Sequence, residues 1–96
     1  MPDISVHRSH ELGLADAKSK VDDIIADIQK DFGDLVNNVA WNSDGTVADV
    51  TGKAFKGKFS LGEDKVGIDV DLAFFAKPLK KKIQSQIEER MTRYFG

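Results

Sequence analysis

Hydrophobic and polar residues alternate with a period of two along residues 54–75, the most regular stretch of the chain. Strict alternation over this length is typical of β-strands that have one buried and one exposed face. With a short turn near the middle, Phe59 faces Ile68 on one face and Lys58 faces Asp69 on the other. One register thus pairs apolar side chains and opposite charges at once, so the pattern predicts a β-hairpin at the centre of the fold.

Two further strands are predicted before this hairpin, at residues 36–41 and 46–51. They flank the sequence Asn-Ser-Asp-Gly at residues 42–45, whose composition is typical of a tight turn. A four-residue turn there places Val39 opposite Ala48. The chain from residue 36 to residue 75 is therefore expected to form a four-stranded antiparallel meander.

A two-residue turn at residues 52–53 leads into the central hairpin and is expected to place Ala48 opposite Gly57. Two small residues side by side on a bulky apolar face predict a shallow trough. A helix axis is expected to lie in this trough. A large side chain at Gly57 would then destabilise the fold by about 1–3 kcal/mol through overpacking.

Apolar residues recur every three or four positions in two other segments, which predicts two amphipathic helices. Ser9 is the preferred cap of the first helix, and Gly33 ends it where a left-handed residue is usual. The second helix is expected to begin at Pro78, because proline suits the first helical position. The two apolar stripes are Leu14, Ala17, Val21, Ile24, Ile25, Ile28 and Phe32, and Leu79, Ile83, Ile87, Met91 and Tyr94 or Phe95.

The elements combine into an α+β fold of order β-α-β-β-β-β-α, counting a short first strand around Ile4 and Val6. We expect a twisted antiparallel sheet of four to five strands with both helices packed on its apolar face. The predicted strand order is 1-5-4-3-2, because the first strand then covers the free edge of the last. Residues 1–96 form a single domain, since the chain is too short for two cores.

Composition narrows the possible functions. A net charge of −2 gives no overall attraction to nucleic acid, so no nucleic-acid partner is predicted. The chain has no cysteine, which excludes disulfides and thiol chemistry. No apolar run is long enough for a transmembrane segment, and the first residues lack the apolar core of a signal peptide, so a cytoplasmic location is expected.

The second helix begins with a cluster of lysines, although acidic residues are usually preferred at the start of a helix. Lys77, Lys80, Lys81 and Lys82 lie where the helix dipole is already positive and acidic residues are favoured. One interpretation is a solvated basic turn that is partly neutralised by acids such as Asp71. The other is a binding surface for anions or phosphate-rich ligands.

Catalytic and metal chemistry have little support in the sequence. His7 and His10 match no standard ligand spacing, so neither a metal nor a cofactor is predicted. The serines lie in no nucleophile motif, and no glycine-rich phosphate loop occurs. The carboxylates of Asp69 and Asp71 face lysines instead of a cleft. The protein is therefore expected not to be an enzyme.

Two aromatic sites remain as binding candidates. Trp41 lies at a strand end, where its indole N–H is expected to reach a turn carbonyl, with ligand stacking as the alternative. Phe74 continues the apolar face of the last strand, so Phe75 points the other way. Phe75 is then either tucked under the second helix or exposed as part of a docking surface or a dimer contact.

The residues Ile-Ser-Val-His-Arg-Ser-His-Glu-Leu-Gly at positions 4–13, the Phe-Gly pair at 32–33, Trp41 and Phe-Lys-Gly-Lys-Phe at 55–59 form a further pattern. This pattern resembles the polyhydroxyalkanoic acid system family, short bacterial proteins encoded near genes for storage-polyester granules. The resemblance covers nearly the whole chain. The positions that match best are Arg8, His10, Leu12 with Gly13, and Trp41.

The resemblance implies a role connected with polyester granules, and it adds Arg8 and His10 to the candidate binding residues. The element order is also similar to a shortened helix-grip domain, in which a curved sheet wraps a helix and holds an apolar ligand. The leading hypothesis is a non-enzymatic protein that binds the granule surface or a granule-associated protein. The alternatives are a small hydrophobic-ligand carrier and a structural homodimer. A core nearly filled by Leu79, Ile83 and Ile87 is expected, which would exclude the carrier.

Overall fold

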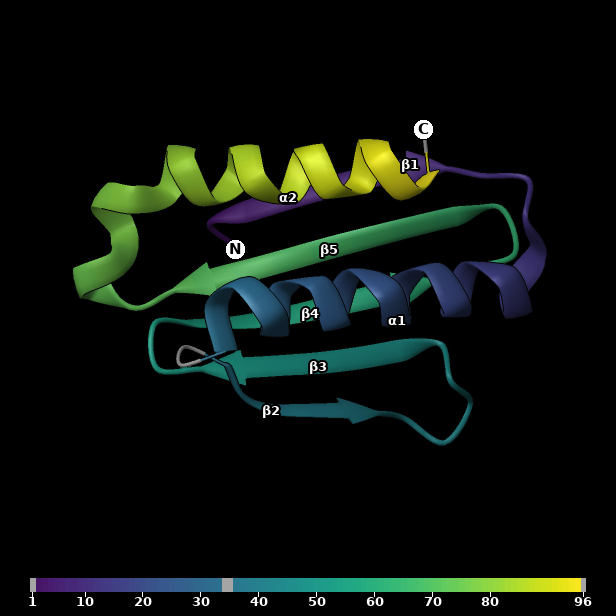
Figure 1. Ribbon diagram of the computed structural model, residues 1–96, viewed down its shortest axis with the longest axis horizontal. Coiled ribbons are helices and arrows are strands. Elements are labelled where there is room, and N and C mark those ends of the chain that lie inside the picture. The colour runs from purple at the N-terminus through teal and green to yellow at the C-terminus, as the bar shows by residue number, and fades with distance from the viewer. Residues whose placement is uncertain (1, 34–35, 96) are drawn as a thin grey trace.

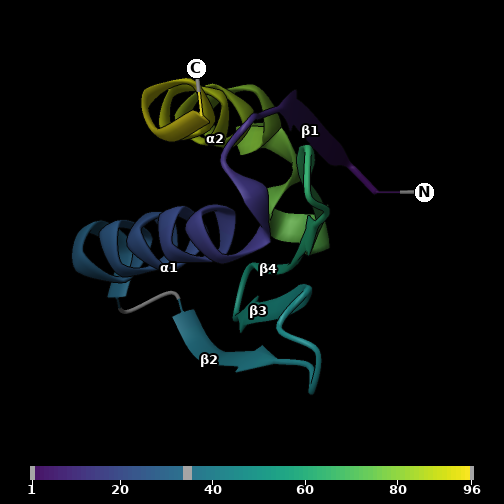
Figure 2. The same cartoon turned by 90° about the vertical axis from the view of Figure 1, so that its right-hand side faces the viewer.

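A computed structural model describes residues 2–33 and 36–95 of the chain. Within these residues the protein is an α+β fold, with a five-stranded antiparallel sheet and two α-helices on one of its faces (Figure 1, Figure 2). The elements follow in the predicted order β-α-β-β-β-β-α. They are β1 (Ile4–Ser9), α1 (Gly13–Phe32), β2 (Val36–Trp41), β3 (Val47–Gly52), β4 (Phe55–Leu61), β5 (Lys65–Leu72), the 3₁₀-helix η2 (Phe74–Leu79) and α2 (Lys80–Phe95).

The strand order β1-β5-β4-β3-β2 confirms the prediction. The central hairpin also has the predicted register, since Phe59 lies opposite Ile68 and Lys58 opposite Asp69. In this alignment apolar residues face one another on the helix side, and oppositely charged residues lie in cross-strand positions on the open side. β1 pairs with β5 and covers the edge that the hairpin would otherwise leave exposed.

The predicted registers of the two preceding strand pairs are wrong by two residues. Ala48 lies opposite Phe59 and Trp41, and Gly57 lies between Val50 and Val70. A shift of two residues keeps every side chain on its face, so alternation does not detect it.

Local hydrogen bonds account for the shift. β3 continues to Gly52, so the turn into β4 falls on the next two residues. In the preceding loop, the Asn42 side-chain oxygen accepts hydrogen bonds from the backbone N–H groups of Thr46 at 2.9 Å and Val47 at 3.1 Å. The Asn42 N–H also donates to the Val47 carbonyl at 2.9 Å. Asn42 therefore faces Val47, and the loop extends through Thr46.

Both predicted ends of α1 are corrected. Ser9 belongs to β1, where it pairs with Lys65, and α1 begins after Leu12 without a side-chain cap. Gly13 has a φ of 79° in the turn into the helix, a conformation that favours glycine. Gly33 has a φ of −53° and is not left-handed. Pro78 lies within η2, so α2 begins two residues after the predicted position.

The core is packed unevenly between the two helices. α1 buries Ala17, Val21, Ile24 and Ile25, and it packs over β4. α2 packs over β1 and buries Met91, whereas its other apolar residues are only partly buried (Figure 2). The predicted stripe position Phe32 lies outside the described side chains. The space under the first turns of α2 is consequently less well filled than the space under α1.

We predict that Gly57→Ala raises the free energy of unfolding by about 0.5–1 kcal/mol, because glycine in a strand interior loses more conformational freedom on folding than alanine. An added Cβ would meet its nearest heavy atoms, the Val50 oxygen and Val70 Cγ2, at 3.6 and 3.8 Å. These are ordinary contacts. Urea unfolding followed by circular dichroism measures the change.

Gly67→Ala is the matched control, on the opposite face of the sheet. A Cβ there would lie 2.3 Å from His7 Nδ1, so the His7 ring must move and lose its 2.8 Å contact with the Ser5 hydroxyl. We expect no comparable gain at Gly67. Destabilisation by Gly57→Ala of more than about 1 kcal/mol would contradict the open space above Gly57.

Candidate functional site

An apolar cavity of about 410 Å³ lies between the helices and the centre of the sheet. This volume falls in the range of about 300–1,000 Å³ that small-molecule sites occupy. The sheet supplies the floor, α1 supplies Ile28, and η2 with the first half of α2 supplies the remaining walls. The lining residues are Ile28, Val50, Ala54, Phe55, Gly57, Phe59, Ile68, Val70, Phe75, Ala76, Leu79, Lys82, Ile83, Gln86, Ile87 and Arg90.

The cavity corrects two expectations. Leu79 is 53% exposed, and Ile83 and Ile87 are only partly buried, so these side chains do not fill the trough and the core is not nearly full. Gly57 lies in the floor of the cavity, with room for a side chain above it. The predicted overpacking penalty for a larger residue at Gly57 is therefore wrong.

A buried arginine joins the two helices beside the cavity. Arg90 of α2 is only 5% exposed, and its guanidinium lies 2.8 Å from Asp31 Oδ2 and 3.2 Å from Asp27 Oδ2 of α1. Its Nη1 also donates to the Gln86 side-chain oxygen at 3.0 Å. A buried charge is costly unless it is paired, so this geometry constrains the distance between the helices.

Sequence reasoning did not single out Arg90, although a signal exists. Position 90 follows Ile87 by three residues and Ile83 by seven, which is the spacing of the buried stripe of α2. On α1, Asp27 and Asp31 are four residues apart and so share one face. A cation at a core position of one helix and two carboxylates on one face of the other indicate an inter-helix ion pair.

Three large apolar side chains are exposed at the open end of the cavity. Phe74 is 87% exposed, Phe75 68% and Leu79 53%, and we call these three residues the η2 patch. Phe75 and Leu79 also line the cavity. The expectation that Phe74 faces the helices is wrong, because β5 ends at Leu72 and the chain turns into η2. For Phe75, the exposed alternative is the one observed.

The lysine cluster lies at the same end of the molecule and divides into two parts. The Lys77 ammonium ion-pairs with Asp3 at 3.1 Å, so the neutralising acid is Asp3 instead of Asp71. The hydrogen bond from the Leu72 N–H and that from Lys77 lower the pKa of the Asp3 carboxyl below its ordinary value. Lys80, Lys81 and Lys82 are exposed, and Lys82 lines the cavity.

Trp41 does not join this site. Its indole N–H donates to Asp22 Oδ1 of α1 at 3.1 Å, so the acceptor is a helix carboxylate and not the predicted turn carbonyl. The Lys18 ammonium lies 4.6 Å from the ring centroid, as a cation–π contact. Figure 1 shows the segment between β5 and α2 at the left-hand end of the molecule, well away from the end of β2. Trp41 thus attaches the edge strand to α1.

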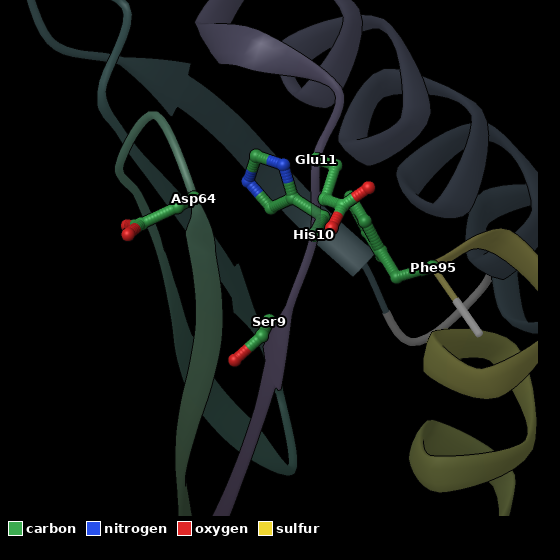
Figure 3. A pocket seen from close by; sticks show the side chains of 5 residues that line it. All are labelled: Ser9, His10, Glu11, Asp64 and Phe95. Carbon is green, nitrogen blue, oxygen red and sulfur yellow. The ribbon is translucent and has the colours of Figure 1, made fainter.

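His10 and Arg8 lie at a third place, around a shallow pocket lined by Ser9, His10, Glu11, Asp64 and Phe95. His10 is buried, and its ring lies beside Glu11 and Phe95, whereas the Ser9 and Asp64 side chains point away from it (Figure 3).

The contacts of His10 and Arg8 explain this placement. His10 Nδ1 accepts from the Leu12 N–H, and Nε2 lies 3.2 Å from the Gly62 carbonyl, so the neutral ring with hydrogen on Nε2 satisfies both. Arg8 donates to the Thr92 hydroxyl of α2 at 3.4 Å. Both side chains tie the β1–α1 corner to neighbouring elements.

The fold and this site define the class of protein: a small α+β protein with an open apolar cavity and an exposed aromatic segment. Its family model matches residues 4–95, and the chain belongs to the family of polyhydroxyalkanoic acid system proteins. The family links the protein to the polyhydroxyalkanoate system. Neither a curated protein nor a solved structure shows significant similarity to the chain.

Among residues 2–33 and 36–95, no helix is long and apolar enough to cross a membrane. Within the same described residues, no three His, Cys, Asp or Glu side chains are grouped closely enough to hold a metal ion.

We predict that Arg90→Met lowers the free energy of unfolding by about 1–3 kcal/mol, because Asp31 loses this cation and Asp27 keeps only the more distant Arg93, at 3.6 Å. This loss of unfolding free energy is smaller than the loss expected for a fully buried ion pair, because both carboxylates are partly exposed. Arg93→Met is the control: Arg93 is 53% exposed, and its loss should cost less than about 0.5 kcal/mol. Equal urea midpoints for Arg90→Met and wild type would refute the ion-pair constraint.

We predict that Asp3→Asn destabilises the protein at pH 7 and that this difference disappears in acid. The pKa of Asp3 is lower in the folded state, so its contribution to stability is present above about pH 4 and is lost as the pH falls through the folded-state pKa. Urea unfolding of both proteins from pH 7 to pH 2 measures the difference. A difference that stays constant over this range would show that the Asp3 charge is not involved.

Proposed function

We propose that the protein is a non-enzymatic component of the polyhydroxyalkanoate system that acts in the cytoplasm by binding the polyester granule surface through the η2 patch. The observation that carries this proposal is the exposure of Phe74, Phe75 and Leu79 within one short segment. Large apolar side chains grouped on a surface mark an interaction site more often than chance exposure. The family membership identifies the system in which such a surface would act.

The surroundings of the η2 patch suit a polyester surface. An aliphatic polyester offers apolar chain to the two phenylalanines and ester carbonyls to hydrogen-bond donors. The ammonium groups of Lys80, Lys81 and Lys82 lie next to the patch and are exposed. Apolar contact would supply most of the affinity, so binding should persist in salt.

The other candidates use the same end of the molecule differently. A granule-associated protein or a second copy of this chain would also cover the η2 patch. A small hydrophobic-ligand carrier, of the kind that helix-grip domains provide, would use the cavity instead of the patch. The open cavity favours this second candidate.

We predict that the purified protein co-sediments with protein-free polyhydroxybutyrate particles at both low and high salt. The double variant Phe74→Ser/Phe75→Ser should bind at least tenfold more weakly, because it removes most of the exposed apolar area of the patch. Leu12→Ser is the matched control, since Leu12 is an exposed apolar residue outside η2. Its binding should equal that of the wild type.

Three outcomes would contradict granule docking. The first is no sedimentation with polyester. The second is binding to anionic liposomes alone, with loss in salt, which would assign the role to the lysines. The third is a wild-type dimer that the double variant converts to a monomer in sedimentation velocity, since the η2 patch would then be covered by a second copy.

A further inference from the structure

We propose that the cavity binds one medium-chain carboxylic acid, with its alkyl chain over Gly57 and its carboxylate at Lys82. This site shares Phe75 and Leu79 with the η2 patch, but binding of the acid does not depend on granule docking. Three observations carry the proposal: the size of the cavity, the chemistry of its walls and the charge at its open end.

The size of the cavity fits a single alkyl chain. At roughly 30 Å³ for each methylene-sized group, 410 Å³ holds about ten carbon atoms with the usual packing gaps. A single helical turn, about 10 Å across and 5.4 Å long, would occupy the whole volume. A helix from a partner protein or from a second copy would therefore enter by little more than one turn.

The walls of the cavity are almost wholly apolar, and three residues with polar ends lie along one side. The floor and one wall are apolar, formed by Gly57, Val70 and Ile83 among others. Lys82, Gln86 and Arg90 follow one another at four-residue intervals in a row along α2, and they line the cavity mainly with their aliphatic atoms. Arg90 is ion-paired with α1 at the buried end of this row, and Lys82 is exposed at the other end.

The open end of the cavity is electropositive. Lys80, Lys81 and Lys82 occupy the first turn of α2, which contains no acidic residue, and the helix dipole adds to their charge. An anionic head group there would be stabilised by Lys82 while its chain displaces water from the apolar floor. A neutral chain lacks this attraction, and a cationic head group would be repelled.

Isothermal titration with sodium decanoate, below its micelle-forming concentration, tests the proposal. We expect saturable binding of one decanoate per chain, with affinity falling about fourfold for each methylene removed in the series to hexanoate. Gly57→Leu places a side chain into the cavity and should weaken decanoate binding at least tenfold. Circular dichroism of the Gly57→Leu variant is the control that tests whether it is folded.

Lys82→Glu tests the carboxylate position without disturbing the core. It should weaken decanoate binding about tenfold and leave 1-decanol binding unchanged, because only the acid carries the charge. Lys81→Glu is the matched control: it makes the same charge change at an exposed position that does not line the cavity. Its decanoate affinity should stay within about threefold of wild type, through long-range screening alone.

The proposal is overturned if decanoate does not bind, if Gly57→Leu binds it as well as wild type, or if Lys81→Glu and Lys82→Glu have equal effects.

Polyester co-sedimentation separates this result from granule docking. Gly57→Leu should sediment with polyester as the wild type does, whereas Phe74→Ser should keep decanoate binding, since Phe74 does not line the cavity. Either site is therefore disproved independently of the other.

Discussion

The buried guanidinium of Arg90 is the constraint on which the arrangement of the helices depends. A charge that is 5% exposed is tolerated only where partners replace its water, and Asp27 and Asp31 of α1 provide them. Both helices must therefore lie at a distance that suits ion pairs. At that distance, the aliphatic side chains of α2 do not reach the floor at Gly57, and the cavity remains between the layers.

This arrangement leaves exposed apolar side chains and exposed lysines together at one end of the molecule. The cavity opens beside η2, where Phe74 and Phe75 are exposed and the lysines of α2 begin. The other parts of the molecule are held by specific contacts, with Trp41 bonded to Asp22 in the middle of α1 and His10 to backbone groups at the β1–α1 corner. Of the candidate residues, Phe75, Lys80, Lys81 and Lys82 are exposed at the η2 end, whereas Lys77, Trp41, Arg8 and His10 contact other parts of the fold.

The fold was predictable to the extent that side-chain alternation determines it. The apolar pattern and the charges predict which face of each strand is buried, the strand order and the register that places Lys58 opposite Asp69. They do so because a one-residue error in register would turn every buried side chain to the exposed face. A two-residue error reverses none, so Ala48 was placed opposite the wrong residue. The exposure of Phe74 depends on where β5 stops, and the cavity depends on helix spacing set by Arg90. Neither the end of β5 nor the spacing of the helices can be read from the order of apolar residues along the sequence.

Xenon binding followed by methyl chemical shifts tests the open cavity most directly, because xenon enters apolar cavities without needing a charged partner. We expect saturable shifts at the methyl groups of Val50, Val70, Ile28 and Ile83, which line the cavity, and none at Val21, which is fully buried and does not line it. Shifts that are absent, or that are equal at Val21 and Val70, would show that the helices close on the sheet and that no cavity exists.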